Sequence, residues 1–213
     1  MRLILASASP RRAELLRAAG YDFEIAVADV DERTRTGETP AAYVRRLAAD
    51  KSAAAMMMYV GSGFSRTDGG PPEGRPRENI LILGADTTVV VDSEILGKPR
   101  DDDEAAAMLR RLSGRRHDVL TGVSIRQGAH EVGRVDSTAV WFSPLTKEDI
   151  AWYVASGEGR DKAGAYAIQG LASRFIPRIE GSYANVVGLP VAVVAELLRS
   201  VLASHSETGY SDS

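Results

Sequence analysis

The sequence predicts an α/β protein built on one mixed β-sheet. Residues 80–85 form a continuous apolar run of the kind found in buried central strands. Two further apolar segments, 119–125 and 135–142, have the length and spacing of a long strand pair. Helical segments occur between the strands at irregular intervals, so strands and helices do not alternate strictly. A mixed sheet therefore fits better than a doubly wound parallel sheet.

The chain is expected to begin with a strand over residues 3–6, followed by a helix starting at Pro10. Ser9 stands at the N-cap position, proline suits the first helical position, and Gly20 ends the helix. A second strand over residues 23–27 follows, because its apolar residues alternate with polar or small ones.

A long helix is predicted from Pro40 to about Tyr59. Its apolar stripe consists of Tyr43, Val44, Leu47 and Ala48. Residues 61–79 contain 5 Gly and 3 Pro among 19 positions, a composition typical of a flexible surface loop. A strand resumes directly afterwards, which argues against a linker between domains.

The C-terminal half is expected to contain strands and helices in mixed order. They are strands over 80–85 and 88–91, a helix from Asp101, the strand pair 119–125 and 135–142, a helix from Thr146 to Ser156, a strand over 174–179 and a helix over 189–202. Thr146 and Asp149 have the spacing of a capping pair. Residues 204–213 are predicted to be a mobile tail.

Composition excludes several classes of protein. The 213 residues suffice for one domain with its own core, and no apolar run approaches the roughly 18 residues of a membrane span. The N-terminus lacks the pattern of a signal peptide, and the absence of cysteine excludes disulfides and thiolate chemistry. A net charge of −3 argues against a nucleic-acid coat. We expect a cytoplasmic protein with no nucleic-acid or membrane partner.

Lysine is rare, with 4 Lys among 26 basic residues. Where only positive charge matters, an arginine-rich chain uses arginine, so the remaining lysines mark positions that need a compact ammonium group. They are Lys51, Lys98, Lys147 and Lys162.

The segment from Ala6 to Arg12 joins a strand end to a helix N-terminus, where α/β proteins commonly bind anions. Ser7, Ser9, Arg11 and Arg12 add donors suited to phosphates. A simple helix cap with two solvated arginines is an equally open interpretation. The segment lacks the glycines of a phosphate-binding P-loop.

Asp86, in the segment Gly84-Ala85-Asp86-Thr87, is expected directly after a buried strand, where an unpaired charge is costly. A metal ion or a basic neighbour would offset that cost, although a carboxylate that caps a turn remains the alternative. The pair Asp31-Glu32 resembles a solvated acidic pair by itself. Residues 101–104 are also acidic, but they stand at a helix start and are interpreted as structural.

Residues 161–170 (DKAGAYAIQG) combine small residues with Lys162 and Gln169, whose amide suits a base edge. Residues 181–190 read as a glycine-rich turn before the last helix. The three histidines are scattered, and no HExxH, GxSxG or GxGxxG motif occurs. What remains, an acidic pair with several cations, favours metal-assisted phosphate chemistry.

Five segments together resemble the Maf family, the septum-formation-inhibitor-like nucleotide pyrophosphatases. They are LILASASPRRAELL, ILGADTTVVVDSEILGKPRD, MLRRLSG, DKAGAYAIQG and GSYANVVGLP, spread from Leu3 to Leu202. The resemblance implies an elongated mixed β-sheet flanked by helices, with two lobes around a nucleotide cleft, related to the inosine triphosphate pyrophosphatase fold. It implies one such domain over residues 1–203.

The same resemblance implies hydrolysis of a nucleoside triphosphate to the monophosphate and pyrophosphate, with dTTP and UTP as substrates. It makes Asp86 the proton acceptor, and Glu32 with Asp86 the ligands of Mg²⁺ or Mn²⁺. It assigns the substrate to Ser7, Arg11, Arg12, Lys51, Thr87, Lys98, Lys162 and Gln169. Arg11, Thr87 and Gln169 would help to select the base. A homodimer is the family expectation.

Two features depart from the family pattern: Ala167 stands where the family often has glycine, and the loop 61–79 is longer than usual. The first leaves 7-methyl-GTP, CTP or a modified uridine nucleotide as alternative substrates. A nucleotide-sensing regulator of cell division that does not hydrolyse is a further alternative. The presence of both Asp86 and Glu32 favours catalysis, because a sensor needs no base.

Overall fold

The computed structural model describes residues 2–61 and 80–207, with only the backbone described at residues 60–61 and 204–207. Its strands are β1 (Arg2–Ala6), β2 (Phe23–Ile25), β3 (Ile80–Val91), β4 (Glu94–Leu96), β5 (Arg116–Gln127), β6 (His130–Trp141) and β7 (Arg178–Glu180). Its helices are α1 (Pro10–Ala18), α2 (Pro40–Gly61), α3 (Asp102–Leu112), α4 (Lys147–Ala155), α5 (Tyr183–Val187) and α6 (Val191–Glu207), with 3₁₀ helices η2 (Ala163–Ala165) and η3 (Leu171–Phe175).

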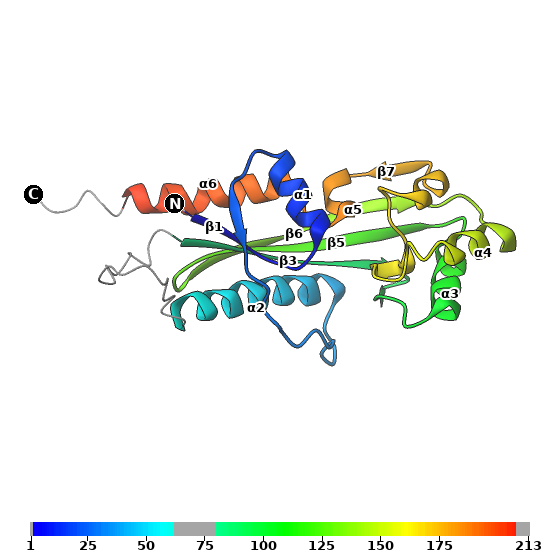
Figure 1. The fold of residues 1–213 in the computed structure, drawn as a ribbon, viewed down its shortest axis with the longest axis horizontal. Helices are drawn as coiled ribbons and strands as arrows, with labels where there is room; N and C mark the ends of the chain where they lie inside the picture. Colours follow the sequence, from blue (N-terminus) through cyan, green and yellow to red (C-terminus); the bar gives the residue numbers. More distant parts are fainter. Residues whose placement is uncertain (1, 62–79, 208–213) are drawn as a thin grey trace, which may run out of the picture.

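All seven strands of the described ranges form one mixed sheet in the order β2-β1-β3-β5-β6-β7, and β4 pairs with β3. β1 runs parallel to β2 and β3, whereas the other pairs are antiparallel. The molecule is elongated along β3, β5 and β6 (Figure 1). The prediction of an elongated mixed sheet flanked by helices is confirmed.

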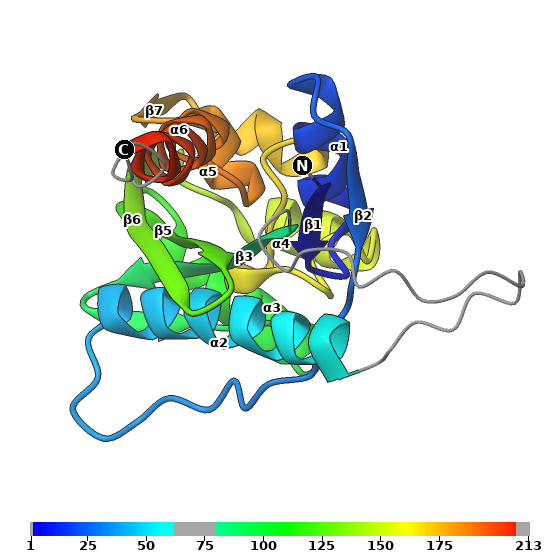
Figure 2. The ribbon, with the colours of Figure 1, turned by 90° about the vertical axis from the view of Figure 1, so that its left-hand side faces the viewer.

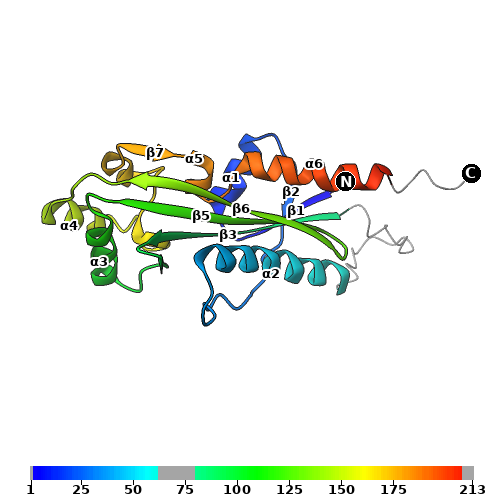
Figure 3. The ribbon, with the colours of Figure 1, turned by 180° about the vertical axis from the view of Figure 1, so that it is seen from behind.

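Helices cover both faces of the sheet. α2 lies along one face, and α1, α5 and α6 lie along the other (Figure 2). Seen from behind, α3 and α4 lie at the end of the long strands opposite to the end that α6 covers (Figure 3). No helix in the described part of the chain is long and apolar enough to cross a membrane.

β3 passes through three hydrophobic clusters. Leu83 packs in the cluster that includes residues of α1 and α6, and Ile82 packs in the cluster that includes residues of α2. Val89 and Val91 belong to the cluster at the other end, with residues of α3 and α4. The polar residues 86–88 therefore lie between these cores, in the middle of the molecule.

The expected break between strands 80–85 and 88–91 is wrong. Asp86 stays in register with Gly122 of β5, and Thr87 with Thr121, so the ladder continues through the polar positions. Asp86 consequently lies within a central strand rather than after one, and only 8% of its surface is exposed. The polar residues 86–88, which suggested the end of a strand, instead lie inside the sheet and mark a site there.

The approach of α2 to the sheet depends on glycines. A Cβ atom at Gly84 would lie 2.2 Å from the carbonyl oxygen of Ala48, and one at Gly122 would lie 2.1 Å from that of Val44. Because α2 rests directly on these two positions, its side chains reach the polar centre of β3.

Gly84→Ala is therefore expected to lower the free energy of unfolding by about 1–3 kcal/mol, since the new methyl group forces α2 off the sheet. Urea unfolding measures the change. Gly97→Ala is the matched control, because nothing lies within 4 Å of a Cβ there. Equal stability of the two variants would contradict the packing described.

Other boundaries differ from the predictions. The expected strand 174–179 is instead η3 followed by the short β7, and β2 ends at Ile25. β5 and β6 are longer than predicted, and α6 continues to Glu207. Ser9 occupies the N-cap of α1 but its side chain makes no capping hydrogen bond. The capping box of Thr146 and Asp149 is confirmed.

Of the predicted loop 61–79, Gly61 ends α2 and the remainder lies outside the described residues, as do residues 208–213 of the predicted tail. The acidic segment 101–104 is structural, as predicted. Asp101 accepts a hydrogen bond from the backbone N–H of Glu104 and caps α3.

Candidate active site

A cleft of about 860 Å³ lies beside the centre of β3. Its volume is within the range of small-molecule sites. Its walls come from the β1–α1 junction, the segment after β2, α2, β3, the segment after β4 and residues 161–169. It contains every predicted site residue: Ser7, Arg11, Arg12, Glu32, Lys51, Asp86, Thr87, Lys98, Lys162 and Gln169. Lys147, the remaining lysine, is exposed at the start of α4 and is not part of the lining.

Glu32 and Asp86 meet at one cation. Lys51 Nζ on α2 lies 2.7 Å from Glu32 Oε1 and 2.7 Å from Asp86 Oδ1. Burial acts to raise the pKa of Glu32, but the hydrogen bond and charge of Lys51 outweigh it, so this pKa lies below its usual value. Glu32 is therefore ionised at neutral pH, and one oxygen of each carboxylate is held by the ammonium group.

Arg12 is bonded to the protein itself. Its Nε donates to the carbonyl oxygen of Gly188 at 2.8 Å, and its Nη1 donates to Ser7 Oγ at 3.1 Å and to the carbonyl oxygen of Ala85 at 2.8 Å. Its Nη2 donates to Thr87 Oγ1 at 3.0 Å. Burial lowers the pKa of Arg12, although the charge of Asp86 opposes this shift. Four of its five N–H donors are thus used, and they connect α1 to three segments: the β1–α1 junction, β3 and the residue after α5.

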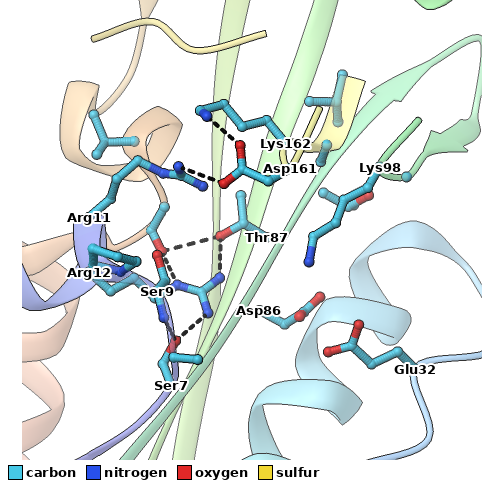
Figure 4. Close-up of a pocket in the computed structure, with 18 of the residues that line it drawn as sticks. Ser7, Ser9, Arg11, Arg12, Glu32, Asp86, Thr87, Lys98, Asp161 and Lys162 are labelled. Carbon is cyan, nitrogen blue, oxygen red and sulfur yellow. Dashed lines mark hydrogen bonds and ion pairs between the residues drawn. The ribbon is translucent and has the colours of Figure 1, made fainter. Parts of the chain in front are cut away.

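The remaining cations lie around the cleft with freer side chains (Figure 4). Arg11 Nη1 lies 3.4 Å from Asp161 Oδ2, and Lys162 Nζ lies 2.5 Å from Asp161 Oδ1. Lys162 also donates to the carbonyl oxygen of Glu158 at 2.7 Å. Lys98 points toward the two carboxylates and has no ion pair with any residue that the structure describes.

Gln169 lines the cleft, is exposed and makes no hydrogen bond within the described ranges. The neighbouring Tyr166 is fixed from behind, because its hydroxyl group lies 2.8 Å from Nε2 of the buried His117. Burial lowers the pKa of His117 to about 4, so the imidazole is neutral at physiological pH. Thr87 Oγ1 is already bonded to Arg12 and lies 2.9 Å from Thr121 Oγ1.

Two side chains of the cleft, those of Tyr43 and Asp161, contact predicted site residues but were not themselves predicted. Tyr43 was expected in the apolar stripe of α2, yet it lines the cleft and donates to the carbonyl oxygen of Glu32 at 2.9 Å. The sequence signal for this role was its hydroxyl group, which no other residue of the stripe has. The other stripe residues are fully buried in the structure. Asp161 stands in the conspicuous segment 161–170, but only the structure shows that it faces both Arg11 and Lys162.

The acidic pair fits a divalent metal ion. Both carboxylates reach the same ammonium nitrogen, so they converge on one point, and carboxylate oxygens are the donors that Mg²⁺ and Mn²⁺ prefer. Over residues 2–61 and 80–207, no group of three or more His, Cys, Asp or Glu side chains is arranged so that it could hold a metal ion. At nucleotide sites Mg²⁺ is typically bound by one or two protein carboxylates, with phosphate oxygens and water as its other ligands.

Residues 2–201 match the family described as Maf-like protein. The chain belongs to the Maf family. This membership, which the five sequence segments indicated, is confirmed.

Relatives of this Maf chain share its length. A protein of Symbiobacterium thermophilum named dTTP/UTP pyrophosphatase is 48% identical over 196 residues, which cover 92% of each chain. One of Vibrio cholerae with the same name is 45% identical over 200 residues, which cover 93% of this chain and 97% of the relative. Among solved structures, the Staphylococcus aureus Ham1 protein superposes with a TM-score of 0.49 at 15% identity, covering 96% of this chain and 100% of the other.

Proposed function

We propose that this chain hydrolyses nucleoside triphosphates, with dTTP and UTP as preferred substrates, to the monophosphate and pyrophosphate. The observation that supports this most is the pair Glu32 and Asp86 held by Lys51 beneath a group of cations in one cleft. The names of relatives up to 48% identical support the substrate choice. We further propose that residues 1–203 act as one two-lobed unit in the cytoplasm.

In the reaction, a water oxygen forms a bond to the α-phosphorus, and the bond from that phosphorus to the α–β bridging oxygen breaks. Pyrophosphate leaves with the bonding electrons. Asp86 takes the proton of the attacking water at Oδ2, because Oδ1 is held by Lys51. The position of Asp86 within a central strand keeps this carboxylate fixed relative to the substrate.

Glu32 and Asp86 would hold Mg²⁺ or Mn²⁺, which when bound neutralises phosphate charge and polarises the phosphoryl oxygens. Lys98, Arg11 and Lys162 face the cleft and stabilise the charge that develops on pyrophosphate. For Arg11 and Lys162, the phosphates replace Asp161 as the ionic partner. Ser7 and Arg12 complete the anion site at the start of α1, with at most one guanidinium N–H available to the substrate.

Pyrophosphate release from dTTP, UTP, CTP, GTP, dATP and 7-methyl-GTP, each with Mg²⁺, Mn²⁺ or EDTA, tests the proposal. We expect the highest kcat/KM for dTTP and UTP, with monophosphate and pyrophosphate in equal amounts and no turnover in EDTA. Release of inorganic phosphate in place of pyrophosphate would overturn the reaction. A preference for 7-methyl-GTP or CTP would overturn the substrate, and nucleotide binding without turnover would favour the sensing role.

Gln169→Glu should lower kcat/KM for dTTP and UTP more than for CTP. The side-chain amide can donate to O4 of uracil or thymine and accept from N3–H, whereas a carboxylate only accepts. A reversed hydrogen bond is worth about 1–3 kcal/mol, or roughly 5- to 150-fold in discrimination. Cytosine carries an amine instead of O4 and so loses less. An equal loss on all three nucleotides would show that Gln169 does not read the base.

A further inference from the structure

The segment that carries Glu32 has no regular structure of its own. Residues 26–39, between β2 and α2, contain no helix or strand, and most of them are exposed. The side chain of Glu32 itself remains about half exposed, with 54% of its surface accessible. Sheet pairing fixes Asp86, but nothing comparable fixes Glu32, so its position must depend on contacts from another element.

Those contacts come from two neighbouring side chains on α2. Tyr43 Oη donates to the carbonyl oxygen of Glu32 at 2.9 Å. Arg46 Nη2 donates to the carbonyl oxygen of Arg33 at 3.1 Å, and Arg46 Nη1 makes a longer contact of 3.5 Å to that of Asp31. Three consecutive carbonyl groups, with Glu32 in the centre, therefore accept from residues three positions apart on one helix.

Arg46 is itself held in place. Its Nε lies 2.7 Å from Glu38 Oε1 and its Nη2 lies 2.8 Å from Glu38 Oε2, a two-point ion pair whose side chains are 12% and 9% exposed. Its guanidinium group also stacks 5.6 Å from the ring centre of Tyr43. A fork that binds a carboxylate and backbone carbonyls together is specific to arginine, because lysine offers a single nitrogen.

We propose that Tyr43 and Arg46 are positioning residues that fix the Glu32 segment so that its carboxylate meets Asp86 at the metal site. This inference rests on the proposed function. α2 then holds Glu32 twice, through the backbone by Tyr43 and Arg46 and through the carboxylate by Lys51. The same helix is placed against β3 by Gly84. The geometry of the two carboxylates is therefore set by the contact between α2 and the sheet.

Outer contacts that orient metal ligands typically change metal affinity by about 10- to 100-fold when they are removed. The test uses Mn²⁺ and α,β-imido-dUTP, whose nitrogen bridge resists cleavage, and measures free Mn²⁺ by electron paramagnetic resonance. We expect Arg46→Met to weaken Mn²⁺ binding at least about 10-fold. Tyr43→Phe, which deletes one hydroxyl group, should weaken it less, by a few-fold.

Arg45→Met is the matched control. Arg45 lies beside Arg46 on α2 and is partly buried in an ion pair with Glu131 of β6, at 2.8 Å, but it makes no hydrogen bond or ion pair with the Glu32 segment, residues 26–39. We expect this variant to bind Mn²⁺ as the wild type does. A general loss of helix stability would affect both arginine variants, whereas loss of positioning affects only Arg46→Met.

Glu32→Gln separates this inference from the proposed function. It should weaken Mn²⁺ binding, and adding Arg46→Met to it should cause no further loss, because both changes act on one ligand. If Glu32→Gln weakens binding while Arg46→Met and Tyr43→Phe do not, the positioning role is wrong and the metal site stands. If Glu32→Gln binds Mn²⁺ normally, the metal assignment fails and the inference fails with it. Should Arg46→Met not fold, Tyr43→Phe decides alone.

Discussion

Asp86→Asn is expected to lower kcat for dTTP and UTP by at least about 100-fold, the lower range for loss of a general base. The amide keeps the shape of the carboxylate but can neither take the proton of the attacking water nor carry its charge. The ion pair with Lys51 becomes a hydrogen bond to a neutral amide oxygen, so that ammonium group keeps only the charge of Glu32 opposite it. Steady-state pyrophosphate release over a range of Mg²⁺ concentrations measures the effect.

Asp118→Asn provides the comparison for this variant. Asp118 lies on the adjacent β5, where its carboxylate pairs with Arg116, and it is absent from the cleft lining. The same chemical change there should leave kcat within about two-fold, because surface ion pairs contribute little. Asp86→Asn should still unfold cooperatively, since β3 keeps its backbone pairing with β5. Near-normal turnover by a folded Asp86→Asn enzyme would remove Asp86 from the catalytic role.

Some members of the site could be predicted from their chemical context, whereas Glu32 and Thr87 were assigned only through the resemblance to the Maf family. Asp86 interrupts an apolar run, and three of the four lysines survive in an arginine-rich chain at cleft positions. The mixed sheet could also be predicted, because the strands are continuous apolar runs and the helical segments between them do not alternate strictly with the strands. The local sequence pattern was therefore sufficient to predict a site residue where a charged residue stands next to a buried apolar segment.

What the sequence did not predict depends on contacts between distant segments. The continuity of β3 through Asp86 requires the partner strand β5, which lies more than 30 positions further along the chain. Tyr43 fits an apolar helix stripe until the Glu32 segment is placed beside it. Arg46 carries no local sign of its role, because its partners include backbone carbonyl groups that any residue provides.

Arg12 shows the same limit most clearly. In the sequence it is one of two adjacent arginines at a helix start, and both are equally suited to phosphate. In the structure Arg11 faces the cleft with a long contact to Asp161, whereas Arg12 is bonded to backbone and hydroxyl groups from three segments. Neighbouring residues of one helix point in different directions, and only the packing around α1 determines which of them is internal.

Arg12→Met should therefore lower the free energy of unfolding by about 3 kcal/mol, because polar groups that lose a buried donor cost about 1–3 kcal/mol each and several are affected. The loss is limited because Thr87 Oγ1 keeps Thr121, and Ser7 Oγ still accepts from the N–H of Ser9. Arg12 donates to Ala85 and Thr87, the residues on either side of Asp86. Without these hydrogen bonds Asp86 is held less firmly, so kcat should fall as well.

Arg11→Met separates the two arginines. It should change stability by less than about 0.5 kcal/mol, as is usual for a surface ion pair, while raising KM for every triphosphate. Urea unfolding and nucleotide titrations on both variants measure the difference. If Arg12→Met were as stable as the wild type and raised only KM, its guanidinium group would be a phosphate ligand. The hydrogen bonds to Gly188 and Ala85 would then be replaceable by water. The expected order, with stability lost at Arg12 and substrate affinity lost at Arg11, follows from which donors the protein already uses.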